Sequence, residues 1–425
     1  MREKLFQFIW QFRLYDQTKP LITIDNQEIF VLHPGKLNRD AGPDFFEAKI
    51  KINQTTWVGN IELHLKSSDW NKHLHQENNA YSNLILHVVY TYDEDIQTFS
   101  HSIFPTLELK DHVDLMLLHK YESLMNNQQF IPCATAFEQV PLFIIQQQLD
   151  RMLAERLEEK VQHIQTRLIQ YNNNWQDVFY ILLARGFGLH INQDAFEMLA
   201  LQTPLSLFAK YKNNLLKIEA LLFGQAGFLN DYFDEPYPIL LQKEYAHLKE
   251  LHKLTPIAKE QWKFLRLRPA NFPLIRIAEF AQVLYLSSHL FSKVLEAKTI
   301  KEIEKLFQFA VSDYWLSHYT FQEKSIERNL SLGNSFIHTI IINTIIPSLF
   351  IYGRLHGKEQ HCHRALDMLK NLKAEKNSIL QGFQRLTFVP QHAADTQALL
   401  QLKKQYCDKK RCLDCSIGYR ILKRE

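Results

Sequence analysis

The period at which hydrophobic residues recur changes near residue 112, and this change limits the fold more than any other feature of the chain. Before that point, short runs alternate apolar and polar residues, the pattern of half-buried β-strands. After it, apolar residues recur at helical spacing, most clearly over Val140–Gln170. The strand-like runs are Leu21–Ile24, Glu28–Leu32, Glu47–Ile52, Thr56–Lys66, Asn83–Tyr92 and Phe104–Leu109.

These patterns predict an α+β chain in three parts. Residues 1–112 form a small α/β module with a mixed sheet, a leading helix and a short helix around Asp69–Asn79. Residues 113–400 form a large all-α domain, and residues 401–425 form a basic, cysteine-rich tail clipped to that helical domain. The tail carries eight basic and three acidic side chains, hence +5, and either tracks phosphates or is a solvated terminus.

Composition argues against the common nucleotide-binding folds. The chain has 12 glycines among its 425 residues and contains neither G-x-G-x-x-G nor G-x-x-x-x-G-K-[ST]. Those glycines let the backbone approach a pyrophosphate or cradle a nucleotide phosphate. A dehydrogenase or a P-loop kinase is therefore not expected.

The first residues and the cysteines predict a cytoplasmic protein. Phe6, Ile9 and Trp10 are interleaved with polar residues, which is typical of an amphipathic helix and not of a secretory signal. The most apolar stretch, Ser335–Gly353, is expected to be a buried helix ending near Pro347. Five cysteines, an odd number, favour a reducing compartment. No membrane partner is expected.

Two carboxylates of the first module are predicted to converge. Asp44 precedes the strand Glu47–Ile52, which should form a hairpin with Thr56–Lys66. Within the second strand, Glu62, His64 and Lys66 alternate with apolar residues and therefore share a face. Three such groups are ordinary on a solvated surface, but Asp44 and Glu62 together also suit a Mg²⁺ ion.

The order of a helix, a Pro-Asp at a strand start and a strand bearing Glu-x-basic resembles the PD-(D/E)XK nuclease superfamily. The resemblance implies a restriction-endonuclease-like mixed sheet, with Asp44 and Glu62 as ligands of Mg²⁺ or Mn²⁺. His64 occupies the position of the usual lysine, as a base or a further ligand. Lys66, two positions on, would assist the attacking water from a displaced position.

The whole chain also resembles a family of bacterial proteins classed as a domain of unknown function. The resemblance is carried by the runs HPG-x-LN, AGPDF, W-x-G-x-IELH, SSDW-x-KH-x-H, AY-x-NLILHVV and RLRPANFP, and by the cysteines near the end. It implies kinship over the full length and no particular activity.

Further histidines surround these carboxylates in the sequence. His73-x-His75, beside Asp69, is either a transition-metal pair, since imidazole suits Zn, Mn and Fe, or a pair of surface histidines. His87 lies in an apolar run and is expected to be a hydrogen-bonded core histidine.

The tail contains the densest group of metal-binding residues, Cys407-x₄-Cys412-x₂-Cys415. C-x₂-C can hold zinc through two thiolates, and the full spacing matches the plant-type iron–sulfur run. A fourth ligand must come from upstream, with Cys362 as the first candidate and Cys133 as the second. The alternative is three thiols without a metal.

In the helical domain, Arg266, Arg268 and Arg276 surround two prolines and either grip phosphates or pair with carboxylates. The leading hypothesis is a metal-dependent nuclease that hydrolyses or binds nucleic-acid phosphodiesters. The alternative is a non-catalytic scaffold, with an inactive nuclease-like module, that binds nucleic acid or a protein partner. A third reading is an iron–sulfur redox protein.

Overall fold

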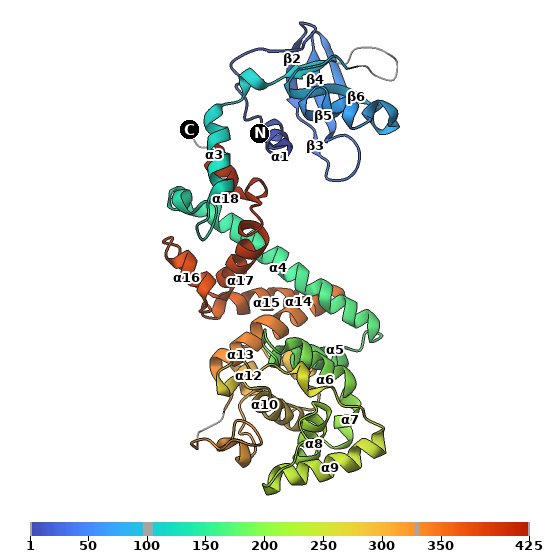
Figure 1. The fold of residues 1–425 in the computed structure, drawn as a ribbon, viewed down its shortest axis with the longest axis vertical. Helices are drawn as coiled ribbons and strands as arrows, with labels where there is room; N and C mark the ends of the chain where they lie inside the picture. The colour runs from blue at the N-terminus through green and yellow to red at the C-terminus, as the bar shows by residue number, and fades with distance from the viewer. Residues whose placement is uncertain (1, 97–104, 328–330, 424–425) are drawn as a thin grey trace. The chain divides into compact units, whose positions relative to one another are not determined.

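The protein is described by a computed structural model that covers residues 2–96, 105–327 and 331–423 (Figure 1). The chain forms two compact units. The first comprises residues 1–150, 382–388 and 400–425, and the second comprises residues 151–381 and 389–399. The bounds of these units differ from the predicted division, because residues 113–150 of the predicted helical domain fall in the first unit together with the cysteine-rich tail.

The first unit contains a seven-stranded mixed sheet in the order β1-β2-β4-β5-β6-β7, with β3 paired to β4. Neighbours from β1 to β5 are antiparallel, whereas β5, β6 and β7 are parallel. The predicted hairpin is present, with Phe45 opposite Ile61. The strands are β1 (Leu21–Ile22), β2 (Glu28–His33), β3 (Lys36–Leu37), β4 (Phe45–Ile52), β5 (Thr55–Lys66), β6 (Leu84–Thr91) and β7 (Thr106–Glu108).

Two helical segments of this unit pack against β5. The leading helix α1 (Glu3–Gln11) buries an apolar face, and its Trp10 Nε1 donates a hydrogen bond of 3.0 Å to the Pro34 carbonyl. Between β5 and β6, the chain crosses over through α2 (Asp69–Lys72) and two 3₁₀ turns. A crossover of this kind is what lets β5 and β6 run parallel. The predicted α/β module is thus confirmed.

The rest of the first unit joins α3 to the tail. The tail helix α18 packs its Tyr419 ring against Phe12 of the N-terminal segment, at a centroid distance of 4.6 Å. Arg39 pairs with Asp414 at 3.1 Å. The elements are α3 (Leu115–Asn126), a 3₁₀ helix (Ala134–Gln139), the start of α4 (Leu142–Gln170), a π-helical segment (Leu402–Cys407), a 3₁₀ turn (Cys412–Asp414) and α18 (Ser416–Lys423).

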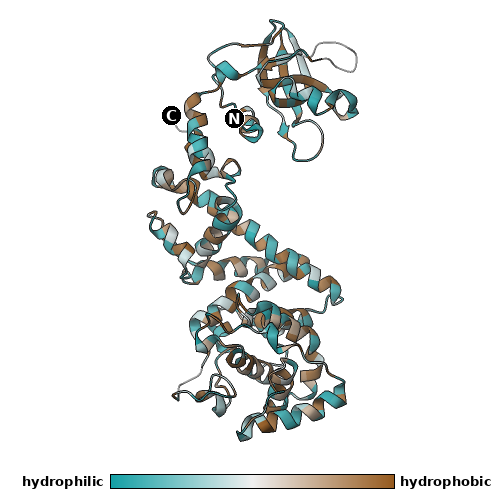
Figure 2. Ribbon diagram, viewed as in Figure 1, coloured by the Kyte–Doolittle hydropathy of each residue, from teal (hydrophilic) through white to brown (hydrophobic). Residues whose placement is uncertain are grey.

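The second unit is helical, as predicted for the main part of the chain. Its core surrounds α10, which is buried on every side over its first three turns and is mainly brown in Figure 2. A helix that is apolar all round must be covered by others, here chiefly α5 and α8. The helices are α5 (Trp175–Phe187), α6 (Gln193–Gln202), α7 (Leu205–Lys210), α8 (Leu215–Gln225), α9 (Pro236–His252), α10 (Pro273–Leu286), α11 (Leu290–Glu296), α12 (Ile300–Lys305), α13 (Asn334–Ile340), α14 (Ile346–Leu355), α15 (Glu359–Asn371), α16 (Ser378–Gln384) and α17 (Ala393–Gln401).

The apolar stretch at Asn334–Leu355 is long and hydrophobic enough to cross a membrane, and 72% of its most apolar 18-residue window is buried inside the protein. The helix does not end near Pro347 as expected. A π-helical segment at Ile341–Ile345 precedes the proline, which then stands in the first turn of α14. The wider π turn relieves the clash and the missing donor that a proline imposes on a regular helix.

Candidate metal centre

Asp44 and Glu62 meet at the start of β4, as the hairpin predicts. The Asp44 backbone N–H donates to Glu62 Oε2 at 3.0 Å, and the Leu63 N–H donates to Asp44 Oδ2 at 3.1 Å. From α1, Gln7 Nε2 donates to Asp44 Oδ1 at 2.8 Å. Each carboxylate is therefore fixed by neighbours from two or more elements.

Burial strongly perturbs this carboxylate pair. Desolvation, followed by the charge of Glu62, raises the pKa of Asp44 to about 7. Desolvation raises the pKa of Glu62 to about 8, and the charge of Glu3 adds to it. Among the described residues, the ion-pair partners of Glu62 are two histidines, His64 and His75. A bound cation would favour the ionised form of both carboxylates.

Histidines line the other side of Glu62. His64 Nε2 lies 3.6 Å from Glu62 Oε1, and His75 Nε2 lies 3.3 Å from the same oxygen. His64 Nε2 is also 3.2 Å from His73 Nδ1, and His64 Nδ1 is 2.9 Å from His87 Nε2. Donor atoms of His64, His73 and His75 all lie within 4.8 Å of one another.

The fold explains why these histidines converge. Glu62 and His64 share a face of β5 because side chains alternate along a strand. His87 stands opposite Glu62 on the parallel neighbour β6. His73 and His75 flank Leu74, whose backbone is left-handed at φ 56°. A non-glycine residue in that conformation is uncommon, and such outliers cluster at functional sites.

The buried imidazoles are neutral near pH 7. Burial, followed by the neighbouring histidines, lowers the pKa of His64 to about 2. Burial likewise lowers the pKa of His87 to about 3. Neutral imidazole is the form that binds a metal. His73 is solvent-exposed, which gives the cluster an open side.

Lys66 does not join this cluster. Its ammonium lies 3.5 Å from Asp93 Oδ2, and its side chain is 60% exposed. Lys66 is the last residue of β5, so its long side chain reaches the loop after β6 instead of the carboxylates. We therefore leave Lys66 out of the site, although it lies on the predicted face of the strand.

Some residues of this cluster escape sequence reasoning. Glu3 and Gln7 lie one helical turn apart on α1, and both act on Asp44 through charge or hydrogen bonding. Tyr81 packs its ring on His75 at a centroid distance of 4.1 Å, and burial raises its pKa. The only sequence signal for Glu3 and Gln7 is their i, i+4 spacing within an otherwise apolar helix.

The three arginines that the sequence singles out, Arg266, Arg268 and Arg276, differ in burial. Arg276 is buried in α10, donates to Glu279 Oε2 at 2.7 Å and to Asn271, and lies over the Phe336 ring. Of the two alternatives that the sequence leaves open, Arg276 therefore takes the second, pairing with a carboxylate, because its guanidinium already has protein partners. Arg266 and Arg268 are exposed.

The cysteines of the tail gather with Cys133. All five cysteines carry thiols. The thiol of Cys407, at the end of the π segment, lies within electrostatic reach of Cys133, Cys415 and Cys412, and burial raises its pKa well above the usual value. Cys362 belongs to the second unit, where its thiol donates to the Phe350 carbonyl at 3.3 Å. The structure thus favours Cys133, the second sequence candidate, as the fourth ligand.

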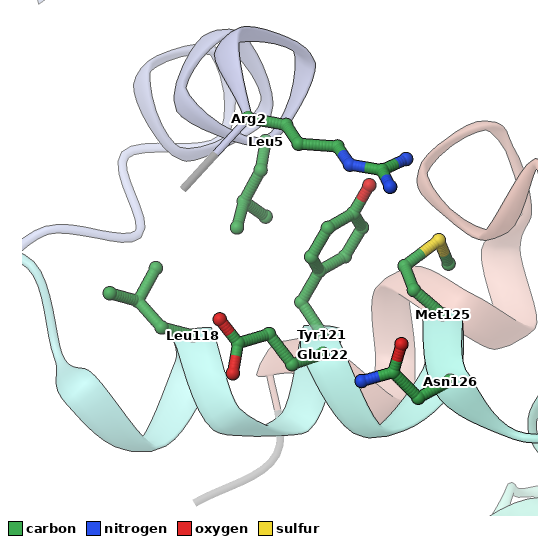
Figure 3. Close-up of a pocket in the computed structure, with 7 residues that line it drawn as sticks. All are labelled: Arg2, Leu5, Leu118, Tyr121, Glu122, Met125 and Asn126. Atoms are coloured by element: carbon green, nitrogen blue, oxygen red, sulfur yellow. The ribbon is translucent and has the colours of Figure 1, made fainter.

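One pocket of about 340 Å³ opens between the start of α1 and α3 (Figure 3). The Arg2 side chain extends over the Tyr121 ring toward its hydroxyl, and Leu5 and Leu118 close the opposite side. Its lining residues include a single carboxylate, Glu122, and no cluster of metal-binding or nucleophilic groups. The pocket therefore offers less chemistry than the histidine–carboxylate cluster.

Comparison with known proteins identifies the relatives of this chain. Residues 3–378 match one protein family, described as "Protein of unknown function (DUF2851)". No curated protein and no solved structure matches the chain. The match confirms the whole-chain resemblance expected from the sequence, and the chain belongs to the family DUF2851.

Proposed function

We propose that this protein is a metal-dependent hydrolase of nucleic-acid phosphodiesters that works in the cytoplasm. The observation that carries the proposal is the pair of half-buried Asp44 and buried Glu62, joined by a 3.0 Å hydrogen bond from the Asp44 backbone N–H to Glu62 Oε2 and flanked by neutral histidines. The mixed sheet, with the pair at the start of β4 and inside β5, agrees with the nuclease-like module that the sequence resembles.

Some side chains of the site would bind the cation, and others would hold those ligands in position. A divalent metal at this site would withdraw charge from the scissile phosphate and lower the pKa of a bound water. Asp44 and Glu62 supply negative oxygens, and the Leu63 N–H and Gln7 keep Asp44 in one orientation. His64 is buried and neutral with its Nε2 toward Glu62, so it acts as a ligand and not as the base that replaces a lysine.

The second candidate is a non-catalytic protein that binds nucleic acid or a protein partner through this module. The position of Lys66 favours it, because the one lysine on that face of β5 pairs with Asp93. In this alternative, the exposed Arg266 and Arg268 of the second unit would supply phosphate contacts of their own.

The two candidates are separated by a cleavage assay on plasmid DNA, single-stranded DNA and RNA with Mg²⁺, Mn²⁺ or Zn²⁺. We expect metal-dependent cleavage that is lost in Glu62→Gln and in Asp44→Asn. Glu47→Gln is the matched control, because Glu47 is exposed and pairs with Lys36 at the surface. Cleavage that persists in both site variants contradicts the hydrolase.

Binding is measured on the same samples by fluorescence anisotropy. Salt-sensitive binding without turnover in every metal supports the second candidate, since counterion release dominates phosphate contacts. Failure to bind any nucleic acid at low salt contradicts both nucleic-acid readings and favours a protein partner.

A further inference from the structure

We propose that His64, His73 and His75, with Glu62 as the fourth ligand, bind one divalent transition-metal ion of the zinc class. The three imidazoles offer donor atoms within 4.8 Å of one another. As an account of the metal's role, this inference rests on the function proposed above. The binding of the ion itself does not depend on whether the protein cleaves a substrate.

The distances between donor atoms match a coordination shell. Two ligands at about 2.1 Å from a metal, at tetrahedral or octahedral angles, lie about 3.0–3.4 Å apart. His64 Nε2 is 3.2 Å from His73 Nδ1 and 3.6 Å from Glu62 Oε1. His75 Nε2 is 3.3 Å from that oxygen. One ion can therefore contact the three imidazoles after small shifts, whereas Glu62, which lies outside the group of donors within 4.8 Å of one another, completes the shell only after a larger movement of its side chain.

Two imidazole nitrogens of the cluster, His75 Nε2 and His87 Nδ1, lack a hydrogen-bond partner among the described residues. His75 Nε2 is buried and makes no hydrogen bond among the described residues, although it points at Glu62. An unsatisfied buried polar atom of this kind costs stability in the folded state. A metal bound between the imidazole and the carboxylate would remove that cost.

His87 acts as a positioning residue behind the ligands. Its Nε2 lies 2.9 Å from His64 Nδ1, inside the core. When His64 Nδ1 donates this hydrogen bond, His64 Nε2 keeps its lone pair and directs it at His73 and Glu62. Second-shell bonds of this kind fix the tautomer and the ring plane of a ligating histidine.

The donor set selects the metal class. Three imidazole nitrogens and one carboxylate suit zinc, manganese or iron, whereas Mg²⁺ prefers oxygen ligands and retains several waters. The histidines therefore direct the site away from the Mg²⁺ expected of the carboxylate pair alone. Asp44 remains beside Glu62 to contact a second ion or a metal-bound water.

The test is direct metal binding, without a cleavage readout. Chelated protein is titrated with Zn²⁺ or Co²⁺ and its metal content is measured after dialysis, with millimolar Mg²⁺ present. We expect His73→Ala and His75→Ala each to lose one equivalent of bound metal, or to bind that metal ion at least about 100-fold more weakly. His190→Ala is the matched control, because His190 is exposed in the second unit.

His73 is exposed, so its replacement leaves the core intact, and circular dichroism checks the fold of each variant. Unchanged stoichiometry and affinity in both histidine variants overturn the site. Histidine-dependent binding without cleavage upholds the site and contradicts the hydrolase. Cleavage that needs Glu62 but persists in histidine variants that have lost the ion upholds the hydrolase and overturns the role of the histidine-bound ion in the reaction.

We further infer that Cys133, Cys407, Cys412 and Cys415 hold one iron–sulfur cluster. An independent observation carries this second site: the fold brings Cys133 to the three thiols of the tail. Packing holds the two segments together, since Phe130 contacts Phe383 and lies under the Lys403 ammonium at 5.0 Å. Lys410 also donates to the Met125 carbonyl.

The spacing of the tail cysteines favours a cluster over a single ion, because Cys407-x₄-Cys412-x₂-Cys415 matches the plant-type iron–sulfur run. A zinc ion with Zn–S of about 2.3 Å holds its sulfur ligands about 3.8 Å apart. An iron–sulfur cluster spreads its thiolates over several irons and so accepts a wider set.

Two variants distinguish the proposed fourth ligand from its rival. Protein purified without air is assayed for iron and acid-labile sulfide and by absorption spectroscopy. We expect a brown chromophore that is lost in Cys133→Ala and kept in Cys362→Ala. Loss in Cys362→Ala with retention in Cys133→Ala overturns the assignment. Stoichiometric zinc without iron, or no metal at the thiols, overturns the cluster.

Discussion

Buried carboxylates occur in both units of the chain, but their partners differ. In the second unit, Glu279 accepts a hydrogen bond from Arg276 at 2.7 Å, and Glu197 is paired with both Arg167 and Arg185. In the first unit, Asp44 and Glu62 face each other and the histidines. Arginine partners make a buried carboxylate structural, whereas a pair without a permanent cation is ready to receive one.

This contrast separates stability from function. The ion pairs of the second unit neutralise charge within the folded chain and need no ligand. The cluster of the first unit leaves buried carboxylates with raised pKa values and an imidazole nitrogen without a hydrogen bond. Metal binding should therefore change the stability of the first unit and leave the arginine-paired core unaffected.

The largest effect is expected from breaking an arginine pair. Arg276→Ala leaves Glu279 buried without its cation and removes the contact with the Phe336 ring. We expect it to lower the free energy of unfolding by about 3–5 kcal/mol, measured by urea denaturation. Arg268→Ala, at an exposed position, should change it by less than about 0.5 kcal/mol. Equal effects of the two variants would contradict the structural role of Arg276.

Zinc should stabilise the first unit by a smaller amount. Free Zn²⁺ at about 100 times its dissociation constant adds about 2.7 kcal/mol to the stability of a unit that binds it only when folded. Thermal unfolding followed by calorimetry measures the shift. His73→Ala should abolish the part of the zinc-induced shift that depends on the histidines, and His190→Ala should leave the shift unchanged. An identical zinc shift in both variants would show that the stabilising ion binds elsewhere.

The stability of the metal-free first unit should fall as pH rises. Folding raises the pKa of Asp44 to about 7 and that of Glu62 to about 8, from about 4 in the unfolded chain. The stability associated with the protonated forms is complete below about pH 4 and is lost as pH rises through those folded values. Between pH 6 and pH 8 the two carboxylates lose about 4 kcal/mol, and the buried His64 and His87, whose pKa values folding lowers, regain about 2 kcal/mol, so we expect a net loss of about 2 kcal/mol.

Glu62→Gln tests the origin of this pH dependence, since the amide cannot ionise. Its unfolding profile should be flatter than that of the unchanged protein over the same range. Saturating Zn²⁺ should also flatten the profile, because a cation compensates the ionised carboxylates. If the free energy of unfolding of the metal-free protein rises from pH 6 to pH 8, the carboxylates are not unpaired as described.

The smallest effect is expected at Lys66. Its pair with Asp93 is exposed, and such pairs contribute about 0–1 kcal/mol. Lys66→Ala should therefore leave metal content and cleavage unchanged and lower stability by less than about 1 kcal/mol. A large loss of cleavage with intact metal binding would return Lys66 to the site as a water-positioning group.

Local patterns account for the part of the site that the sequence predicts. Period-two alternation and the turn before Phe45 are enough to place Asp44 near Glu62, because hairpin register follows from local pairing. The strands and the helical second part follow from hydrophobic periodicity in the same way, whereas the mixed strand directions are implied by the resemblance to the nuclease superfamily. The family match supports kinship and adds no activity.

The remaining contacts depend on tertiary structure. From the sequence, His73 and His75 are better explained as surface histidines, whereas in the structure they flank the left-handed Leu74 and lie close to His64. In the sequence, Cys362, flanked by two histidines, looks like the better fourth ligand. In the structure, the tail packs against the segment around Phe130, and this packing brings Cys133 close to the tail thiols. Sequence separation carries no information about such long-range contacts.

Anomalous diffraction from a crystal of the zinc-loaded protein is the most direct test of the proposed metal site at His64, His73, His75 and Glu62. The account predicts an anomalous peak at the zinc edge within bonding distance of His64 Nε2, His73, His75 and Glu62, with a coordination shell of about 2.0–2.2 Å. The peak should be absent from crystals of His73→Ala. Zinc bound only at the thiols, with an empty histidine cluster at saturating metal, would contradict it.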